Sequence, residues 1–218
     1  TISTIGLSLA DGSGVASNYI LDSATIDITR RVLNLDGVKA FDGTNTVSSS
    51  ELSLGNLVSG ESLSLSGSGT VPNSNAEMNK TLTLGTLEIS DGSGGVASNY
   101  TLSSGNHTFD ISQLSVNISG NRVYNGTTTV DSSDLILTNL VSGQNVGLSG
   151  TGSVLDQNVG ANKVVTLGTL ALTGDGSANY ILTDYTTTFE ITPRIVNSTS
   201  SRVYDGTNNA LAADITLS

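Results

Sequence analysis

The sequence has no cysteine and no tryptophan, and it holds one histidine, one methionine and two prolines among 218 residues. Without cysteine there is no disulfide, no thiolate metal site and no Cys nucleophile. The single histidine, His107, lies in the phrase GNHT and has no counterpart where the related stretch is YTTT. Because a catalytic histidine needs an orienting partner and a nearby nucleophile, we expect no enzymatic activity and no catalytic residue.

Positive charge is scarce as well. Lys and Arg number 8 against 19 Asp and Glu, which gives a formal charge of −11. We therefore expect no binding to nucleic acid or anionic membrane. No apolar run is long enough to span a bilayer, so we also expect no membrane insertion. No cationic start followed by an apolar run is present. Because the sequence begins inside one repeat and stops inside another, as described below, we expect it to be a piece of a longer protein.

The abundant residues favour strands and turns over helices. Only 36% of the chain is hydrophobic, and apolar residues recur at every second position in ELSLGNL, TLTLGTLEI and TFDISQLSVNI. This period is that of a strand with one buried face. Phrases such as VSGE and DGSG form turns between the strands, and only SSSEL and DSSDL indicate a short helical turn. We predict an all-β fold of sandwich or β-grasp-like type, with six or seven strands per module and antiparallel pairing because the connections are short.

The chain is a tandem repeat. Tyr124 follows Phe41 by 83 residues, and Tyr204 follows Tyr124 by 80. The difference falls in a Gly/Ser-rich loop, where EISDGSGGVASNY is shortened to LTGDGSANY, and loops absorb such changes more easily than cores. Modules of this length are in the range of small independent domains, which we expect to be arranged end to end. The predicted boundaries are 1–30 for the C-terminal part of a preceding repeat, 31–112 and 113–192 for two full repeats, and 193–218 for the N-terminal part of a following repeat.

One phrase marks the repeat most clearly. It is KAFDGT at Lys39–Thr44, RVYNGT at Arg122–Thr127 and RVYDGT at Arg202–Thr207. The residue before glycine alternates between Asp and Asn, as expected of an Asx turn and not of a carboxylate that must ionise. The aromatic residue is Phe in one copy, so its hydroxyl is dispensable and its ring is predicted to anchor the core. The phrase therefore predicts a structural turn.

The chain resembles the YDG repeat modules of large exported bacterial adhesins related to the filamentous haemagglutinins. The resemblance rests on the phrases above and on NLVSG, LSGTGSV, NVGANKVVTLGTLAL and GDGSANYIL. The resemblance covers essentially the whole chain. It implies secretion to the bacterial cell surface, with tandem modules that space a binding region from the cell. The first full repeat departs from the pattern in KAFDGT, and in PNSNAEMNK where the second repeat has LDQNVGANK.

The DGSG loops at Asp11 and Asp91, and the shortened loop at Asp175, raise the question of calcium in so acidic a chain. Calcium takes about six to eight oxygen ligands, and each loop offers one carboxylate. Plain turns are one explanation. Calcium at inter-module loops, with further ligands from backbone carbonyls or a neighbouring module, is the other. The sequence identifies no metal or cofactor ligand.

Two lysines raise the question of a covalent cross-link. Lys80 and Lys163 occupy equivalent places, as do Asp110 and Glu190 in the TF(D/E)I strand. A lysine, an asparagine and a carboxylate held together in an apolar interior can form an isopeptide bond. The alternation of the strand instead places both carboxylates opposite the apolar face, where an exposed cross-strand ion pair is expected.

These observations favour a structural role. A run of similar β modules would act as a spacer or stalk within a surface adhesin, with the neighbouring repeats of the same chain as its partners. The alternative is that each repeat binds a host or matrix glycan or protein and that repetition adds avidity. Carbohydrate sites usually present exposed aromatic platforms, but five of the six tyrosines lie in repeated phrases, and only Tyr185 does not.

Overall fold

The computed structural model describes residues 8–21, 27–209 and 211–217, without the side chains of residues 184–187. Residues 1–7 and 22–26 of the predicted preceding repeat, and the side chain of Tyr185, therefore lie outside the described residues. The chain forms two compact units. The first comprises Thr1–Gly37, Val47–Gly69 and Thr83–Thr108, and the second comprises Val38–Thr46, Thr70–Leu82 and Phe109–Ser218. The second unit thus takes in two segments of the first sequence repeat.

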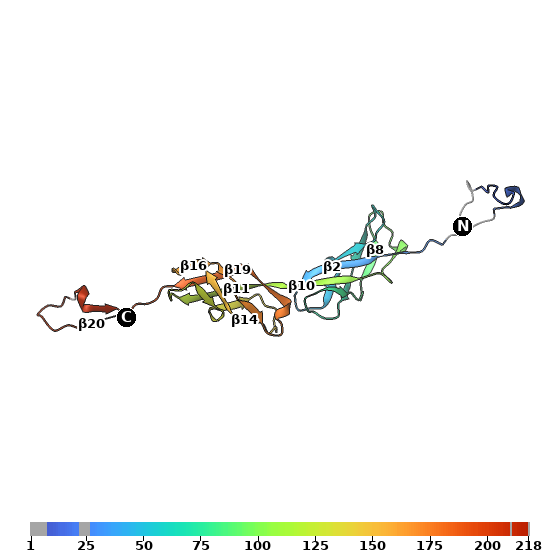
Figure 1. Ribbon diagram of the computed structural model, residues 1–218. Helices are drawn as coiled ribbons and strands as arrows, with labels where there is room; N and C mark the ends of the chain where they lie inside the picture. The colour runs from blue at the N-terminus through green and yellow to red at the C-terminus, as the bar shows by residue number, and fades with distance from the viewer. Residues whose placement is uncertain (1–7, 22–26, 210, 218) are drawn as a thin grey trace. The chain divides into compact units, whose positions relative to one another are not determined.

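Four strands form the main sheet of the second repeat, in the order β13-β11-β19-β16. Their bounds are Leu114–Val123 for β11, Leu135–Thr138 for β13, Gly160–Lys163 for β16 and Tyr180–Thr192 for β19. The central strands β11 and β19, labelled next to each other in Figure 1, run parallel from Leu114 opposite Tyr180 to Val123 opposite Thr192. The outer strands β13 and β16 pair antiparallel with them.

The predicted all-β fold of small sheets is confirmed, but the central pair departs from the predicted antiparallel pairing. Short connections constrain only strands that follow one another. Strands β11 and β19 are the first and last of the repeat, and the chain joins them through all the strands between. A sheet with its first and last strands parallel at the centre has the strand order of the β-grasp-like alternative.

Short strands complete the second repeat. One sheet has the order β12-β15-β17, and β14 pairs with β18. Their bounds are Thr129–Asp131 for β12, Gly147–Ser149 for β14, Thr151–Val154 for β15, Val165–Thr166 for β17 and Ala171–Thr173 for β18. They share one core with the main sheet, made of Ile118, Val130, Leu135, Val154, Val165, Leu170, Phe189 and Ile191. Phe189 and Ile191 are buried while Glu190 between them is exposed, which confirms the alternation predicted from TFEIT.

The first repeat has the same strand order, β4-β2-β10-β7. The bounds are Asn34–Ala40 for β2, Leu52–Gly55 for β4, Glu77–Thr81 for β7 and Thr108–Ser112 for β10. Strand β10 lies parallel to β2, and β4 lies antiparallel to it. Three short pairs join β1 (Arg31–Val32) to β9 (Tyr100–Thr101), β3 (Thr46–Ser48) to β6 (Ser68–Thr70), and β5 (Leu63–Ser66) to β8 (Glu88–Asp91). The repeat in sequence is therefore a repeat of fold.

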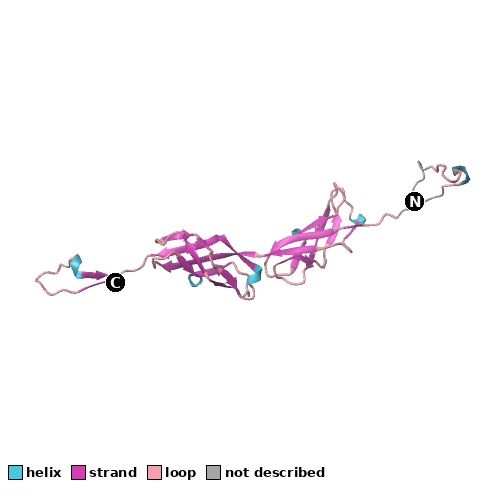
Figure 2. Cartoon of the chain, in the orientation of Figure 1, coloured by secondary structure: helices cyan, strands magenta, loops and turns pink. Residues whose placement is uncertain are grey.

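Helical structure is limited to short 3-10 turns in the part of the chain that the structure describes (Figure 2). The turns predicted from SSSEL and DSSDL are confirmed as η2 (Ser49–Glu51) and η4 (Ser132–Asp134). The others are η1 (Ala16–Asn18), η3 (Ala97–Asn99), η5 (Ser177–Asn179) and η6 (Ala212–Asp214). Among the described residues, none of the helices has the length and apolar character needed to cross a membrane.

The last described segment has the opening hairpin of a module. Strand β20 (Ser198–Ser200) pairs antiparallel with β21 (Ile215–Leu217), as β2 pairs with β4 in the first repeat and β11 with β13 in the second. Val196 is 59% exposed here, whereas Val116 at the corresponding place of the second repeat is fully buried. The segment therefore has the local structure of a module without a closed core.

Candidate functional site

The repeated aromatic-Asx-Gly-Thr phrase folds into the same turn at residues 41–44, 124–127 and 204–207, which we call the Asx-Gly loops. In each, Oδ1 of the Asx residue accepts hydrogen bonds from the backbone N and Oγ1 of the threonine two residues on. The two distances are 2.8 and 2.8 Å at Asp42, 3.1 and 3.0 Å at Asn125, and 2.9 and 2.9 Å at Asp205. The glycines have φ of +81°, +77° and +86°, a region that favours glycine. The turn needs only an acceptor oxygen, so Asn serves as well as Asp, and the predicted Asx turn is confirmed.

A basic residue closes each loop: Lys39 and Arg122 lie in the strand before it, and Arg202 lies just after β20. Lys39 Nζ donates to Asp42 Oδ2 at 3.0 Å and to the Thr46 carbonyl at 2.7 Å. Although partial burial opposes ionisation, hydrogen bonds from Thr44 and Lys39 hold the pKa of the Asp42 carboxyl below its usual value. The arginines in the same place donate to loop carbonyls, Arg122 to Thr127 and Thr129, and Arg202 to Thr207. The repeated charges therefore serve the loops themselves.

The aromatic residue of the loop differs in burial between copies. Phe41 is 2% exposed and meets the ring of Tyr180 edge to face, with centroids 5.4 Å apart and planes at 76°. Tyr124 is half-buried against the core of the second repeat. Tyr204 is 84% exposed, in the segment without a closed core. The predicted core anchor is confirmed for Phe41 and Tyr124.

A second repeated tyrosine holds the VSG turn, a role that the sequence analysis missed. The hydroxyl of Tyr100 accepts a hydrogen bond from the Val58 amide at 3.3 Å, and that of Tyr180 accepts one from the Val141 amide at 3.0 Å. Tyr100 also donates to the Glu61 carboxylate, which raises the pKa of this phenol. The sequence did offer a signal for this contact: NLVSG and an Asn-Tyr pair, at 99–100 and 179–180, are both present in each full repeat.

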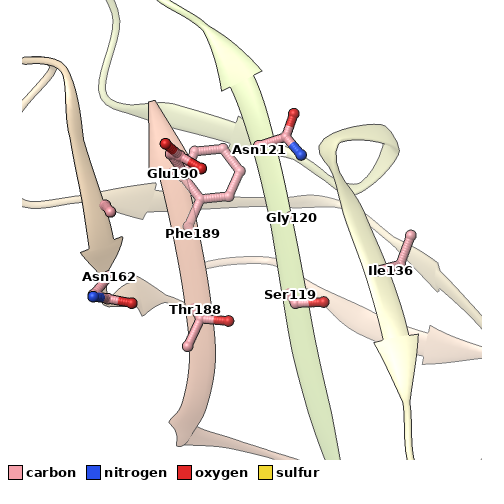
Figure 3. Close-up of a pocket in the computed structure, with 9 residues that line it drawn as sticks. Ser119, Gly120, Asn121, Ile136, Asn162, Thr188, Phe189 and Glu190 are labelled. Atoms are coloured by element: carbon pink, nitrogen blue, oxygen red, sulfur yellow. The ribbon is translucent and has the colours of Figure 1, made fainter. Parts of the chain in front are cut away.

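The main sheet of the second repeat carries a cavity of about 290 Å³ on the face opposite the core (Figure 3). Its polar lining comes from Ser119 and Asn121 of β11, Glu190 of β19 and Asn162 of β16. Hydroxyl, amide and carboxylate groups in this arrangement suit hydrogen bonding to a sugar or a peptide. The ring of Phe189 belongs to the core at 1% exposure, so it offers no aromatic platform.

A cavity of about 400 Å³ with different chemistry lies on the corresponding face of the first repeat and extends to Gln113 and Ala178 of the second. Exposed Val38 and Met78 stand in the places of Asn121 and Ala161. The first repeat thus presents apolar side chains where the second presents an amide. The two cavities do not repeat one ligand chemistry.

The structure does not bring Lys80 and Asp110 together. Lys80 is 4% exposed, and its Nζ lies 2.9 Å from Glu77 Oε2 and 2.7 Å from Asn73 Oδ1. Asp110 Oδ1 instead accepts the backbone N of Asn79 at 2.6 Å. Within the described residues, neither the cross-link geometry nor the alternative ion pair forms between Lys80 and Asp110. The reason is that Lys80 lies inside the fold whereas the carboxylate lies on the other face of the sheet.

In the second repeat the equivalent lysine also has a different partner from the expected one. Lys163 Nζ pairs with Asp156 Oδ1 at 2.8 Å, not with Glu190. The hydrogen bond from Lys163, with a second from the Asn158 amide, holds the pKa of the Asp156 carboxyl below its usual value. Both lysines therefore tie down the loop that leads into their own strand.

The aspartates of the DGSG loops act within those loops. Asp11 Oδ1 accepts the amide of Ala16 at 2.5 Å, Asp91 Oδ1 accepts the amide of Ala97 at 2.7 Å, and Asp175 is exposed. Over the described ranges, no group of three or more His, Cys, Asp or Glu side chains could hold a metal ion. Turn formation accounts for Asp11 and Asp91.

His107 connects two backbone groups of the first repeat. Its Nδ1 accepts the Leu35 amide at 3.1 Å, and its Nε2 lies 2.7 Å from the Leu102 carbonyl oxygen. A neutral ring with the proton on Nε2 satisfies both contacts. Both ring nitrogens are thus engaged in the fold.

Comparison with known proteins gives a repeated match. The family model of the YDG domain matches the chain twice, over residues 29–108 and 112–189. No curated protein and no solved structure matches the chain.

Proposed function

We propose that this chain, which belongs to the YDG domain family, is a run of structural spacer repeats in a secreted bacterial surface adhesin. The repeats would project a binding region away from the cell, and their partners would be the neighbouring repeats of the same chain. The protein would have no enzymatic activity and need no cofactor.

One observation carries this proposal: the most strongly repeated polar residues serve the fold itself. Asp42, Asn125 and Asp205 each accept two hydrogen bonds from the threonine of their own turn. Lys80 and Lys163 likewise pair with residues of their own repeat. A repeated ligand site would leave such groups free to meet a ligand.

The charge of the chain agrees with this role. The formal charge of −11 favours solubility and disfavours association with anionic surfaces. An array of acidic modules is suited to standing in solvent between a cell and its target.

The alternative function is glycan or host-protein binding by each repeat. The cavity of Ser119, Asn121, Asn162 and Glu190 is the observation that favours it. Avidity requires the same site in every copy, and the first repeat has Val38 in the place of Asn121. A binding site in one repeat alone would act singly.

Three experiments test these functions. An antibody raised against this chain should label intact bacteria that make the parent protein, and deletion of the repeats from the parent should reduce adhesion without changing the affinity of its isolated binding region. The purified chain should bind nothing on a glycan array. Glycan binding that is lost in Asn162→Ala and kept in Met78→Ala would contradict the spacer proposal and support the alternative.

A further inference from the structure

Within the second unit, one Asx-Gly loop is seated on the second repeat. The ring of Phe41 packs against the edge of Tyr180 at 5.4 Å between centroids. The next contact is at Gly43, where an added Cβ would lie 2.7 Å from Val141 Cγ1. Glycine therefore allows both the left-handed turn and the close approach of the loop to Val141.

The surface of the second repeat that faces this loop and Ala76 is made of Val141, Ala178, Asn179 and Tyr180, and we call it the socket. Asn179 is 5% exposed, and its Oδ1 accepts the amide of Ala76 at 2.8 Å. Tyr180 is 2% exposed and its hydroxyl holds the Val141 amide at 3.0 Å. The socket combines an aromatic ring, an aliphatic side chain and a buried amide. It is filled by Phe41, Gly43 and Ala76 of the first repeat.

The first repeat has the same socket in an open state. The equivalent residues Val58, Ser98, Asn99 and Tyr100 line a cavity of about 390 Å³ in the first unit. The hydrogen bond inside this socket matches that of the second repeat, since the Tyr100 hydroxyl accepts the Val58 amide at 3.3 Å as the Tyr180 hydroxyl accepts the Val141 amide.

Two of the four socket positions differ in exposure between the repeats, whereas Tyr100 and Tyr180 are equally buried at 3% and 2% and both Ser98 and Ala178 are exposed. Val58 is 43% exposed whereas Val141 is half-buried, and Asn99 is exposed whereas Asn179 is buried. The sequence of the socket is nearly unchanged, so the difference comes from the first repeat, whose Asx-Gly loop meets Val141 and Tyr180 and whose Ala76 meets Asn179. The open socket has Val58 and Tyr100 at its centre and the charged residues Arg30, Arg31 and Glu61 around them, and no Asx-Gly loop among the described residues covers it.

A free occupant of the right kind exists in the same chain. The Asx-Gly loop at residues 204–207 has the turn of the seated loop, with both hydrogen bonds to Asp205 Oδ1 at 2.9 Å. Tyr204 is 84% exposed, and a Cβ on Gly206 would meet nothing within 4 Å. The loop is preformed before it docks, so docking would require little ordering of the backbone.

We propose that the open socket of Val58, Ser98, Asn99 and Tyr100 binds an aromatic-Asx-Gly-Thr loop from another copy of this module. The aromatic ring would pack on Tyr100, and the glycine would allow approach to Val58. The proposal depends on the repeat of the module alone, and it stands whether or not the array is a surface spacer.

Photo-cross-linking of the full chain tests the proposal. Tyr204 is replaced by the photoreactive aromatic analogue p-benzoylphenylalanine, and this chain is mixed with ¹⁵N-labelled chain at about 1 mM, the order of effective concentration that a short linker imposes. After irradiation, mass spectrometry identifies the labelled peptides. The expected result is cross-linking to the peptides that carry Val58 and Tyr100, and not to those that carry Val141 and Tyr180, because the second socket is filled.

A variant of the labelled chain provides the control. Val58→Asp places a charge on the docking surface and should lower the yield at this socket about tenfold, and Val96→Asp, at another exposed valine, should leave it unchanged. Equal yields at the two sockets, cross-links spread over the chain, cross-links only within one chain, or no cross-link would each overturn the proposal. None of these outcomes bears on surface location, so failure here is distinct from failure of the spacer function.

Discussion

The hydroxyl of Tyr180 accepts a hydrogen bond from the backbone amide of Val141 at 3.0 Å, and Tyr100 makes the same bond to Val58 in the first repeat. A phenol thus fixes the VSG turn of each repeat to the strand that follows its last 3-10 turn, β19 in the second repeat and β9 in the first. Because Tyr180 is 2% exposed, water does not readily replace its hydroxyl.

Tyr180→Phe should therefore lower the free energy of unfolding by about 1 kcal/mol, since the Val141 amide loses its partner. Urea denaturation measures the effect. Tyr124→Phe is the matched control, because Phe41 fills the equivalent place, and it should change stability by less than about 0.5 kcal/mol. Equal losses in the two variants would show that the hydroxyl of Tyr180 has no special role.

Two glycine substitutions separate backbone strain from close contact. Gly126→Ala forces a side chain into a φ of +77°, where its Cβ would meet only the Tyr124 hydroxyl at an ordinary contact distance of 3.9 Å, and should cost about 1 kcal/mol. Gly43→Ala has the same strain at +81° and adds a Cβ 2.7 Å from Val141 Cγ1, so its cost should be larger by about 1 kcal/mol or more. The same denaturation experiment compares them, and a smaller loss in Gly43→Ala would contradict the seated loop.

The buried amide of Asn179 has an exposed counterpart, which makes a further pair. Asn179→Ala should destabilise by about 1–3 kcal/mol, because the Ala76 amide is left without its acceptor. Asn99→Ala changes an exposed side chain on the open socket and should fall within about 0.5 kcal/mol of the parent. Thermal unfolding by calorimetry distinguishes the two, and a larger effect at Asn99 would contradict the assignment of filled and open sockets.

The ion pair of Lys163 and Asp156 predicts a pH dependence of stability. Its hydrogen bonds put the folded pKa of Asp156 below the unfolded value of about 3.9. In that range the folded chain binds fewer protons than the unfolded chain. The stabilisation is therefore complete above the unfolded pKa and is lost as pH falls through the folded pKa.

Asp156→Asn removes this contribution, so the variant should lose stability less steeply than the parent when denaturation is repeated at decreasing pH below about 4. Glu190→Gln, at an exposed carboxylate with no ion pair in the described part of the chain, should keep the parent slope. Identical slopes for the parent and Asp156→Asn would contradict the assignment.

Much of the fold follows from local pattern. Alternation in TFEIT places Phe189 and Ile191 inside and Glu190 outside because successive side chains of a strand point to opposite faces. The Asp/Asn exchange before glycine at 42, 125 and 205 predicts the turn because the chemistry of an Asx turn is contained in three residues.

Pairing and docking do not follow from local pattern. Alternation in β11 and β19 shows that each strand has a buried face, but it does not identify the partner or its direction, so the parallel pair was not predicted. The Lys80 and Asp110 pairing failed for a similar reason: alternation placed Asp110 opposite the apolar face, but no local pattern shows that Lys80 is buried inside the fold. The approach of Gly43 to Val141 joins residues of two different repeats, and the sequence around either residue does not indicate it.

The candidate cavity is the least predictable feature. Its lining residues Ser119, Asn121 and Asn162 are polar residues of a kind found throughout the chain. Only their placement on neighbouring strands brings them together, and Val38 in the place of Asn121 shows that the repeat does not preserve them.

Small-angle X-ray scattering of the purified chain tests the spacer function most directly. A compact globule of this length would have a radius of gyration of about 17 Å. Modules arranged end to end predict a value well above this, with a long-tailed distance distribution that persists on dilution. A value near 17 Å would mean that the repeats pack side by side, and it would contradict the proposal that they act as a spacer.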